Sequence, residues 1–228
     1  MRYITKGDTP PFFAVDTEGF TKWSDYNKTE ETKQQRRNLR KYLLENEQNY
    51  LCGYCESKVT LEDSHTDHKK PKGLDRYSHL VFSYSNFIVS CEGKEHYSLQ
   101  RKDEEAPEST CGHKKDNEFD EALFIDPHEK ENISTYFTYD KDTGMIMPNA
   151  TDEHSERYKK ANFMIKLLQL NEGFLPRARL NAKKVLHVRL KRIRTGKEDQ
   201  NTEIIRVLES KKIAFISFVD HCFSSRIK

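Results

Sequence analysis

The stretch that decides the fold is LCGYCESKVTLEDSHTDHKKPKG, residues 51–73. It opens with a C-x2-C motif, Cys52 and Cys55, and two further cysteines, Cys91 and Cys111, follow later in the chain. Four thiolates are a common ligand set for a tetrahedral structural zinc ion. A C-x2-C motif alone is a weak signal, but two more cysteines that bracket a histidine segment strengthen it. The sequence therefore predicts one structural Zn²⁺ per chain, bound by these four cysteines.

Two alternatives to a four-cysteine site stay open at this point. The cysteines could be buried thiols without a metal, or His96 or His113 could replace one thiolate. The fifth cysteine, Cys222, lies in an apolar segment, and we expect it to be a small buried side chain. An odd number of cysteines argues against a fully paired disulfide scaffold and favours a reducing compartment.

The segment between the cysteines contains residues suited to phosphodiester hydrolysis. That reaction needs a group that deprotonates water and cations that neutralise charge on the phosphate. His68, with an ordinary pKa of about 6.5, is the candidate base, and Asp67 is a candidate ligand for Mg²⁺ or Mn²⁺. We expect Asn86 to orient His68, His113 to complete the metal site, and Lys115 to add positive charge at the phosphate.

Four polar residues near this pair have no role in the scheme. His65 is expected to lie at the surface or behind the site, and Lys69, Lys70 and Lys72 are expected to belong to a solvated loop. A single histidine is far more often a surface or hydrogen-bonded residue than a catalytic one. Only the joint arrangement of residues supports a catalytic interpretation.

Residue patterns along the chain predict an α+β fold. Strands are indicated by alternating or continuous short apolar runs, and helices by apolar residues at a spacing of three or four. The expected elements are an irregular arm at 1–23 with packed aromatic residues, a helix from Thr29 to near Asn49, a short strand within 59–70, a strand at 86–91, an exposed insertion at 92–110, a helix from Cys111 to before Asp126, a hairpin at 133–147, and helices at 152–170, 177–197 and 204–223.

The composition limits what the chain can bury. Only 35% of the 228 residues are hydrophobic and 33% are charged, so the apolar material is thin for a chain of this length, and we expect support from a metal or a partner. The net charge of +2 by itself predicts no polyanionic partner. No signal-peptide pattern or membrane-spanning run is found, so we expect a cytoplasmic protein that does not associate with a membrane.

One segment concentrates positive charge. Residues 177–197 contain nine Lys and Arg residues and no acid. Ala182, Leu186, Leu190 and Ile193 share one face of the expected helix, and Lys184, His187, Lys191 and Arg194 lie opposite. This face suits phosphates or an acidic protein surface, although an ordinary solvated helix face explains it equally well.

With these residues assembled, the chain resembles the HNH, or ββα-metal, endonucleases, and more closely the PtuB-type HNH proteins of Septu antiphage systems, including retron-associated ones. The resemblance covers residues 1 to about 180. It rests on Met1-Arg-Tyr-Ile4, Leu51-Cys-Gly-Tyr-Cys55, Asp67-His68-x-x-Pro71, Tyr84-Ser-Asn86-Phe with Cys91, Cys111-x-x-x-Lys115, Leu123-Phe-Ile-Asp-Pro127, the hairpin ending near Gly144, and Ile165-x-x-Leu168-x-Leu170-Asn171 with Arg177.

The resemblance implies a zinc-stapled ββα-metal core at 51–150, preceded by an arm and helix at 1–50 and followed by a helical region with the basic helix at 151–228. It also implies a PtuA-type ATPase as partner and, in retron versions, a reverse transcriptase and its RNA-DNA product. Two departures matter. Many relatives have a close cysteine pair where this chain separates Cys91 from Cys111, and Gly112 occupies a position where an Asn or Asp is common. His113 is the substitute ligand, with Asn117 and Asp116 behind it.

The competing hypothesis is a zinc module without catalytic activity that grips nucleic acid or tethers an ATPase. The cysteines do not separate the two hypotheses, because both contain the zinc. An Asp-His pair together with Asn86 and Lys115 has no obvious use in a simple binding module, so the combination favours the nuclease.

Overall fold

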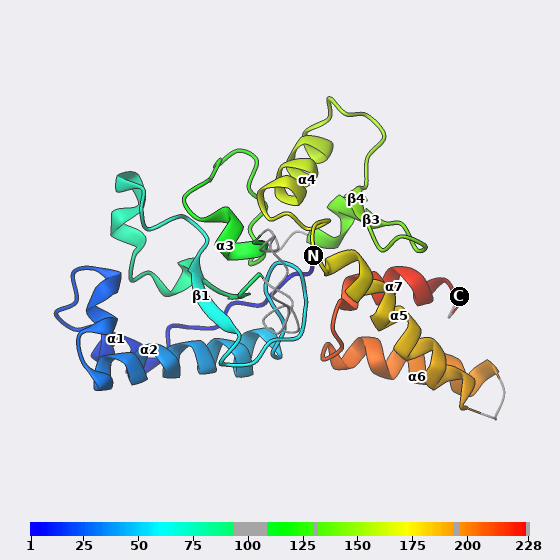
Figure 1. The fold of residues 1–228 in the computed structure, drawn as a ribbon, viewed down its shortest axis with the longest axis horizontal. Helices are drawn as coiled ribbons and strands as arrows, with labels where there is room; N and C mark the ends of the chain where they lie inside the picture. The colour runs from blue at the N-terminus through cyan, green and yellow to red at the C-terminus, as the bar shows by residue number, and fades with distance from the viewer. Residues whose placement is uncertain (94–108, 130–131, 194–196, 227–228) are drawn as a thin grey trace, which may run out of the picture.

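The computed structural model describes residues 1–228 except 94–108, 130–131, 194–196 and 227–228. It contains helices and two small antiparallel sheets, so the predicted α+β class is confirmed. The first sheet pairs β1 (Ser64–His68) with β2 (Phe87–Cys91), and the short helix α3 (Cys111–Lys115) packs against β2. In Figure 1 this strand–strand–helix unit lies above α2 (Glu30–Leu43).

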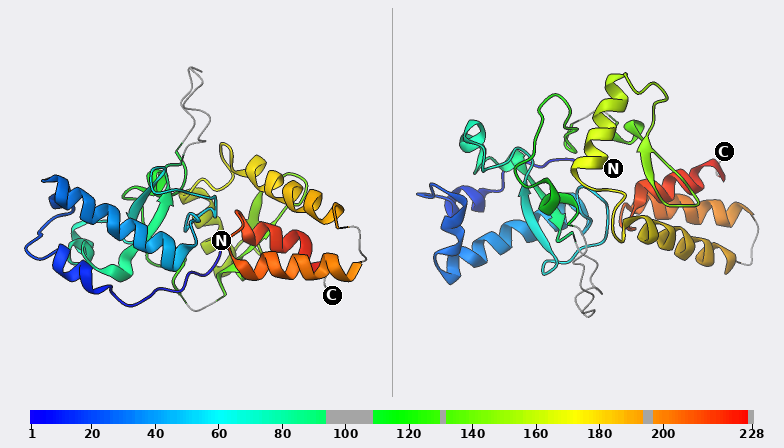
Figure 2. Two further views of the ribbon diagram at one scale, coloured as in Figure 1. Left: turned by 90° about the horizontal axis from the view of Figure 1, so that it is seen from below. Right: turned by 45° about the horizontal axis from the view of Figure 1, so that its top comes forward.

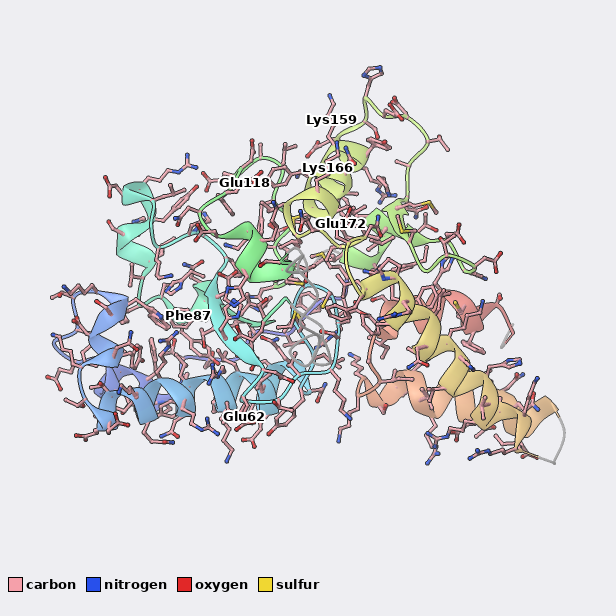
Figure 3. All side chains as sticks on the ribbon, in the orientation of Figure 1. Glu62, Phe87, Glu118, Lys159, Lys166 and Glu172 are labelled. Carbon is pink, nitrogen blue, oxygen red and sulfur yellow. The ribbon has the colours of Figure 1, made fainter. Side chains whose placement is uncertain are left out.

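Every residue of β2 is buried because both faces of the strand are covered. Phe87 points toward the N-terminal elements, where its ring lies 5.5 Å from that of Phe13 (Figure 3). On the opposite face, a Cβ atom built on Gly53 would come within 2.3 Å of the Ile88 side chain, so the cysteine motif packs directly on the strand. The predicted strands at 59–70 and 86–91 are thus confirmed, with the first confined to its last part.

The N-terminal arm is more regular than predicted. α1 (Pro11–Asp16) and a 3₁₀ helix, η1 (Trp23–Asn27), form within or beside the segment expected to be irregular. Pro11 occupies the first turn of α1, where its fixed φ suits a helix and its missing N–H costs nothing. The packing of the aromatic residues was predicted correctly, since Phe13 and Trp23 are buried.

The predicted helix after Thr29 is confirmed as α2. The Thr29 side chain accepts a hydrogen bond from the Thr32 N–H, which caps the first turn. The helix continues into a π-helical turn, η2 (Leu44–Gln48), and ends at Asn49 in the left-handed conformation with φ of 54°.

Two predicted helices have different bounds in the structure. The helix expected from Cys111 to Asp126 ends at Lys115, because Asp116 has φ of 41° and turns the chain away. The single helix expected at 204–223 is two helices, α6 (Lys197–Ser210) and α7 (Ile216–Phe223), because Lys211 and Phe215 have φ of 50° and 53°. The expected insertion at 92–110 lies mostly outside the described residues.

The remaining C-terminal elements form near their predicted positions. η6 (Ile133–Tyr136) leads into a hairpin of β3 (Phe137–Tyr139) and β4 (Ile146–Pro148), and α4 (Glu156–Leu167) and α5 (Leu175–Lys191) follow. However, α4 is shorter than the expected 152–170, and α5 ends at Lys191 while Lys197, the expected end of that helix, begins α6. All the views place α5, α6 and α7 at the opposite end of the molecule from α1 and α2 (Figures 1 and 2).

The two ends meet at the cysteine motif. Glu56, directly after Cys55, is buried and accepts hydrogen bonds from the N–H and the hydroxyl of Ser217, the latter at 2.5 Å. The Glu56 carbonyl accepts another from the Phe215 N–H at 2.8 Å. The start of α7 is therefore fixed to the cysteine motif. In the described part of the chain, no helix has the length and apolar character needed to cross a membrane.

Candidate functional site

The four predicted zinc ligands converge on one point. Cys52 and Cys55 lie in the turn before β1, Cys91 ends β2, and Cys111 begins α3, and their sulfur atoms all lie within 4.8 Å of one another. All four are buried and none is in a disulfide. The Cys91 N–H lies 3.3 Å from the Cys52 sulfur and the Ser57 N–H lies 3.4 Å from the Cys55 sulfur, and both are donors to sulfur.

The dimensions of this cluster fit a tetrahedral ion. Zn–S bonds of about 2.3 Å place two sulfurs of a tetrahedron about 3.8 Å apart, and the sulfurs of Cys55 and Cys91 are 3.9 Å apart. Burial raises the pKa of the Cys111 thiol well above its ordinary value. A divalent cation would provide the charge needed to keep such thiols deprotonated, so the donor set and its spacing suit structural zinc.

Asp67 and His68 lie on opposite faces of β1, because successive side chains of a strand alternate. Asp67 faces α3 and the cysteine motif, where its carboxylate accepts a hydrogen bond from the Tyr54 hydroxyl at 2.6 Å. The same carboxylate lies 3.4 Å from the ammonium of Lys115. The charge of Asp67 is therefore balanced by protein groups.

His68 faces the N-terminal elements and is only 2% exposed. Its ring lies 4.5 Å from the Trp23 ring and 5.1 Å from the Phe87 ring, and its Nε2 is 2.9 Å from the Val81 carbonyl oxygen. Burial lowers the pKa of His68 to about 4, although the hydrogen bond with Val81 opposes this. The imidazole is consequently neutral at neutral pH, the form that accepts a proton, but Trp23 covers it.

Asn86 and Lys115 fix the backbone at the end of β1. The Asn86 amide donates to the Lys70 carbonyl at 3.0 Å and accepts from the Lys70 N–H at 2.8 Å. Lys115 is fully buried and donates to the His68 carbonyl at 3.0 Å. Asn86 thus orients the chain beside His68, whereas the imidazole itself is bonded to Val81.

His113 lies in a separate group with two other potential ligands. Its Nε2 is 2.6 Å from Glu92 Oε2, and the Nδ1 of His65 is 3.4 Å from Glu92 Oε1. The two imidazole rings are 4.1 Å apart between centroids. The contact with His65, followed by the hydrogen bond with His113, lowers the pKa of Glu92 to about 2, although burial opposes this shift. Within the described residues, two groups of three or more side chains are close enough to bind a metal: the four cysteines, and His65 with Glu92 and His113. Asp67 belongs to neither group.

Several partners of these residues were not foreseen from the sequence. Tyr54 lies within the C-x2-C motif, and Trp23 is about 45 positions away from His68, so neither pattern points to the contact. His65 could have been found, because alternation along a strand places it on the same face as Asp67. Lys69 was expected in solvent, but it is 4% exposed and its ammonium lies 2.6 Å from Asp126 Oδ2. The alternative ligand His96 lies outside the described residues.

The geometry defines a class of protein in which four cysteines around one point hold a strand–strand–helix unit with an Asp-His pair at the end of its first strand. No protein-family model matches the chain. The chain is 29% identical over 170 residues to a protein of Vibrio cholerae serotype O1 biovar El Tor named "Retron Vc95 putative HNH endonuclease", and the match covers 74% of each chain.

Proposed function

We propose that this chain is a metal-dependent HNH endonuclease that hydrolyses phosphodiester bonds in nucleic acid. The observation that carries the proposal is the arrangement at the end of β1, where buried Lys115 joins α3 to both Asp67 and the His68 carbonyl. The Asp-His pair, the two strands and the short helix are the parts of a ββα-metal unit. The similarity to a relative named as an HNH endonuclease supports the same activity.

In this proposal His68 is the general base that takes a proton from the attacking water. A pKa of about 4 makes the covered imidazole a weak base at neutral pH, because an efficient base has a pKa near the working pH. Removing the Trp23 ring would expose His68 and return its pKa toward 6.5. The covered arrangement therefore fits a resting enzyme that becomes active when the segment around Trp23 moves.

Asp67 is proposed to hold a Mg²⁺ or Mn²⁺ ion, with His113 as the second predicted ligand. Such an ion, when bound, neutralises charge that develops on the phosphate. In the present conformation the Asp67 carboxylate is engaged by Tyr54 and Lys115 and the His113 ring by Glu92. Binding of one ion by both Asp67 and His113 stays a prediction. It requires the contacts with Tyr54, Lys115 and Glu92 to be replaced by bonds to the ion.

We further propose that the nuclease is a PtuB-type effector of a Septu or retron antiphage system. A PtuA-type ATPase would be its partner, and a reverse transcriptase with its RNA-DNA product would join in a retron version. The retron named in the relative supports this context. The covering of His68 supports regulation by a partner, because an effector nuclease has to be inactive until infection is sensed.

The second candidate function is a zinc module without catalytic activity that binds nucleic acid or tethers an ATPase. Two observations favour it. Asp67 and His68 point to opposite faces of β1, and His68 is almost fully buried. In such a module His68 would be a packing residue, and its replacement would change stability without removing any hydrolysis.

Cleavage of DNA and RNA in Mg²⁺ or Mn²⁺, with and without the ATPase partner, decides between the two. We expect His68→Asn to reduce cleavage at least about 100-fold, the usual effect of losing a general base. The matched control is His154→Asn, since His154 is exposed at the N-terminal side of α4. Thermal unfolding of both variants separates lost chemistry from lost folding. Unchanged cleavage by a folded His68→Asn protein would refute the base assignment.

A further inference from the structure

We propose that His65, Glu92 and His113 form a second metal site, distinct from the four cysteines, which binds a divalent transition-metal ion such as Zn²⁺, Mn²⁺ or Co²⁺. Each residue offers one ligand atom, and these atoms all lie within 4.8 Å of one another. Two imidazoles and one carboxylate with open positions are an established ligand set for such ions.

One of the two ligand separations matches that expected around one ion, and the other is a shorter direct contact that an ion would open. Ligand atoms about 2.0–2.2 Å from a common ion lie about 3–3.5 Å apart at tetrahedral or octahedral angles. The two Glu92 oxygens are 3.4 Å from His65 Nδ1 and 2.6 Å from His113 Nε2. A small adjustment of side chains already facing one another would therefore complete the site.

Rigid elements deliver all three ligands to this position. His65 pairs with Ser90 across β1 and β2, so its place is set by the register of the sheet. Glu92 directly follows Cys91, and His113 is two residues after Cys111, so both are fixed by the cysteine cluster. The backbone bond from the Glu92 N–H to the Asp63 carbonyl, at 3.2 Å, holds the end of β2 beside β1.

Gly112 allows α3 to approach closely enough. A Cβ atom at this position would lie 2.7 Å from His65 Nε2 and 3.0 Å from Ser90 Oγ. The Gly112 N–H donates to the Ser90 hydroxyl at 2.9 Å. The glycine that removes a potential ligand from the helix thus makes room for the His65 ring next to His113.

The side chains also leave space for further ligands of the ion. His65 is 17% exposed, whereas Glu92 and His113 are 42% and 44% exposed. Three protein ligands at the surface leave positions for water or an oxygen anion. Asp67 and His68 supply none of its ligands, but His113 is also the second ligand predicted for the Asp67 ion. Glu92→Gln therefore tests the second site without changing a residue of the proposed nuclease site.

Zinc content and cobalt spectra of the full-length protein test the site. After equilibration with excess Zn²⁺ and desalting, we expect two zinc ions per chain, and one ion in His113→Ala and in Glu92→Gln. In the Co²⁺-loaded protein, the thiolate charge-transfer absorption of the four-cysteine site should persist in both variants, while the weaker ligand-field absorption of the second ion is lost. The control His154→Ala removes an exposed histidine elsewhere and should keep two ions.

One zinc ion per wild-type chain would overturn the proposal, and so would two ions in both variants. If His113→Ala loses the thiolate absorption as well, the Glu92→Gln protein decides, since it keeps every cysteine and histidine. Asp67→Asn separates this site from the nuclease proposal: we expect it to keep two zinc ions while losing cleavage. If Asp67→Asn loses cleavage but the wild type binds only one zinc ion, the nuclease proposal is supported and the second metal site is refuted.

Discussion

At the scale of single residues, the polar groups at the end of β1 are held by buried charges rather than by solvent. Lys69 donates to Asp126 and to His128 Nδ1, the latter at 2.7 Å. Burial, together with the positive charges of Lys69 and Lys6, lowers the pKa of His128 to about 3. His128 therefore acts as a neutral acceptor for Lys69 and has to stay unprotonated in the folded state.

This contact predicts sensitivity to acid. Because the folded pKa lies below the unfolded value of about 6.5, the unfolded chain binds the proton more readily, and stability is lost as the pH falls from 6.5 toward 3. Between pH 7.5 and 5.5 the contribution of His128 to the free energy of unfolding should fall by roughly 1.4 kcal/mol.

His128→Asn tests the expected loss, since the Asn oxygen replaces Nδ1 as an acceptor but does not titrate. Urea unfolding at both pH values should show a smaller drop for this variant than for the wild type. His68, whose pKa is also lowered, contributes equally to both proteins. An equal drop in the variant would show that His128 is already able to protonate in the folded protein.

The identity of the candidate site residues could be predicted from the sequence more readily than the directions of their side chains. The four cysteines were predicted as one cluster, and they form one. The opposite directions of Asp67 and His68 follow from strand alternation alone, but only once the strand is known to include both residues. The Trp23 and Tyr54 contacts depend on packing between distant segments, which no local pattern encodes.

At the scale of elements, periodicity identified most helices and strands but not their ends. α2, β2 and the β3–β4 hairpin were predicted because their apolar spacing is regular. The early end of α3 and the break between α6 and α7 were missed because Asp116, Lys211 and Phe215 have positive φ angles without being glycine. Such positions are imposed by tertiary contacts, so residue preferences give little warning of them.

Helix α5 has the charged face expected from its sequence. Lys184 and Lys191 are exposed while Leu186 and Leu190 are buried; the Arg194 side chain lies outside the described residues. A groove of about 370 Å³ runs beside the helix. Its lining includes four basic side chains and residues of the hairpin turn and α7: Lys141, Asp142, Leu180, Lys183, Lys184, His187, Cys222 and Phe223.

If this face binds phosphates, Lys184→Gln combined with Lys191→Gln should weaken nucleic-acid binding and reduce the slope of log affinity against log salt by up to about 2. Fluorescence anisotropy at several salt concentrations measures the slope. Lys159→Gln with Lys166→Gln on α4 changes the net charge equally and serves as the control (Figure 3). A slope that both pairs change equally would assign the α5 charges to solvation alone.

At the scale of the whole molecule, the buried apolar residues form one cluster that extends from the N-terminal elements to α7. The cluster crosses positions 50 and 150, and the division into 1–50, 51–150 and 151–228 stays a prediction. The low hydrophobic content predicts that the fold needs support from a metal or a partner. Structural zinc can contribute about 10–16 kcal/mol in small domains, comparable with the whole stability of a typical domain of about 5–15 kcal/mol.

Removal of zinc should therefore unfold the central unit. We expect a strong chelator to abolish cooperative thermal unfolding, and Cys91→Ser to do the same without a chelator. Cys222→Ser is the matched control, because Cys222 is buried in α7 outside the four-cysteine cluster. Circular dichroism and zinc analysis provide the measurements. A Cys91→Ser protein that melts like the wild type would remove zinc from the folding account.

The bond between Glu56 and Ser217 spans 161 residues of sequence. At a ribosomal rate of about 5–20 residues per second, roughly 8–32 s separate the synthesis of the two partners. During that interval the segment after Cys55 has no α7 to bind, so α7 can dock on the cysteine motif only after Ser217 has been synthesised. Ribosomal pausing between the codons for Glu56 and Ser217 would lengthen the time before α7 can dock on the cysteine motif, and would so delay complete folding.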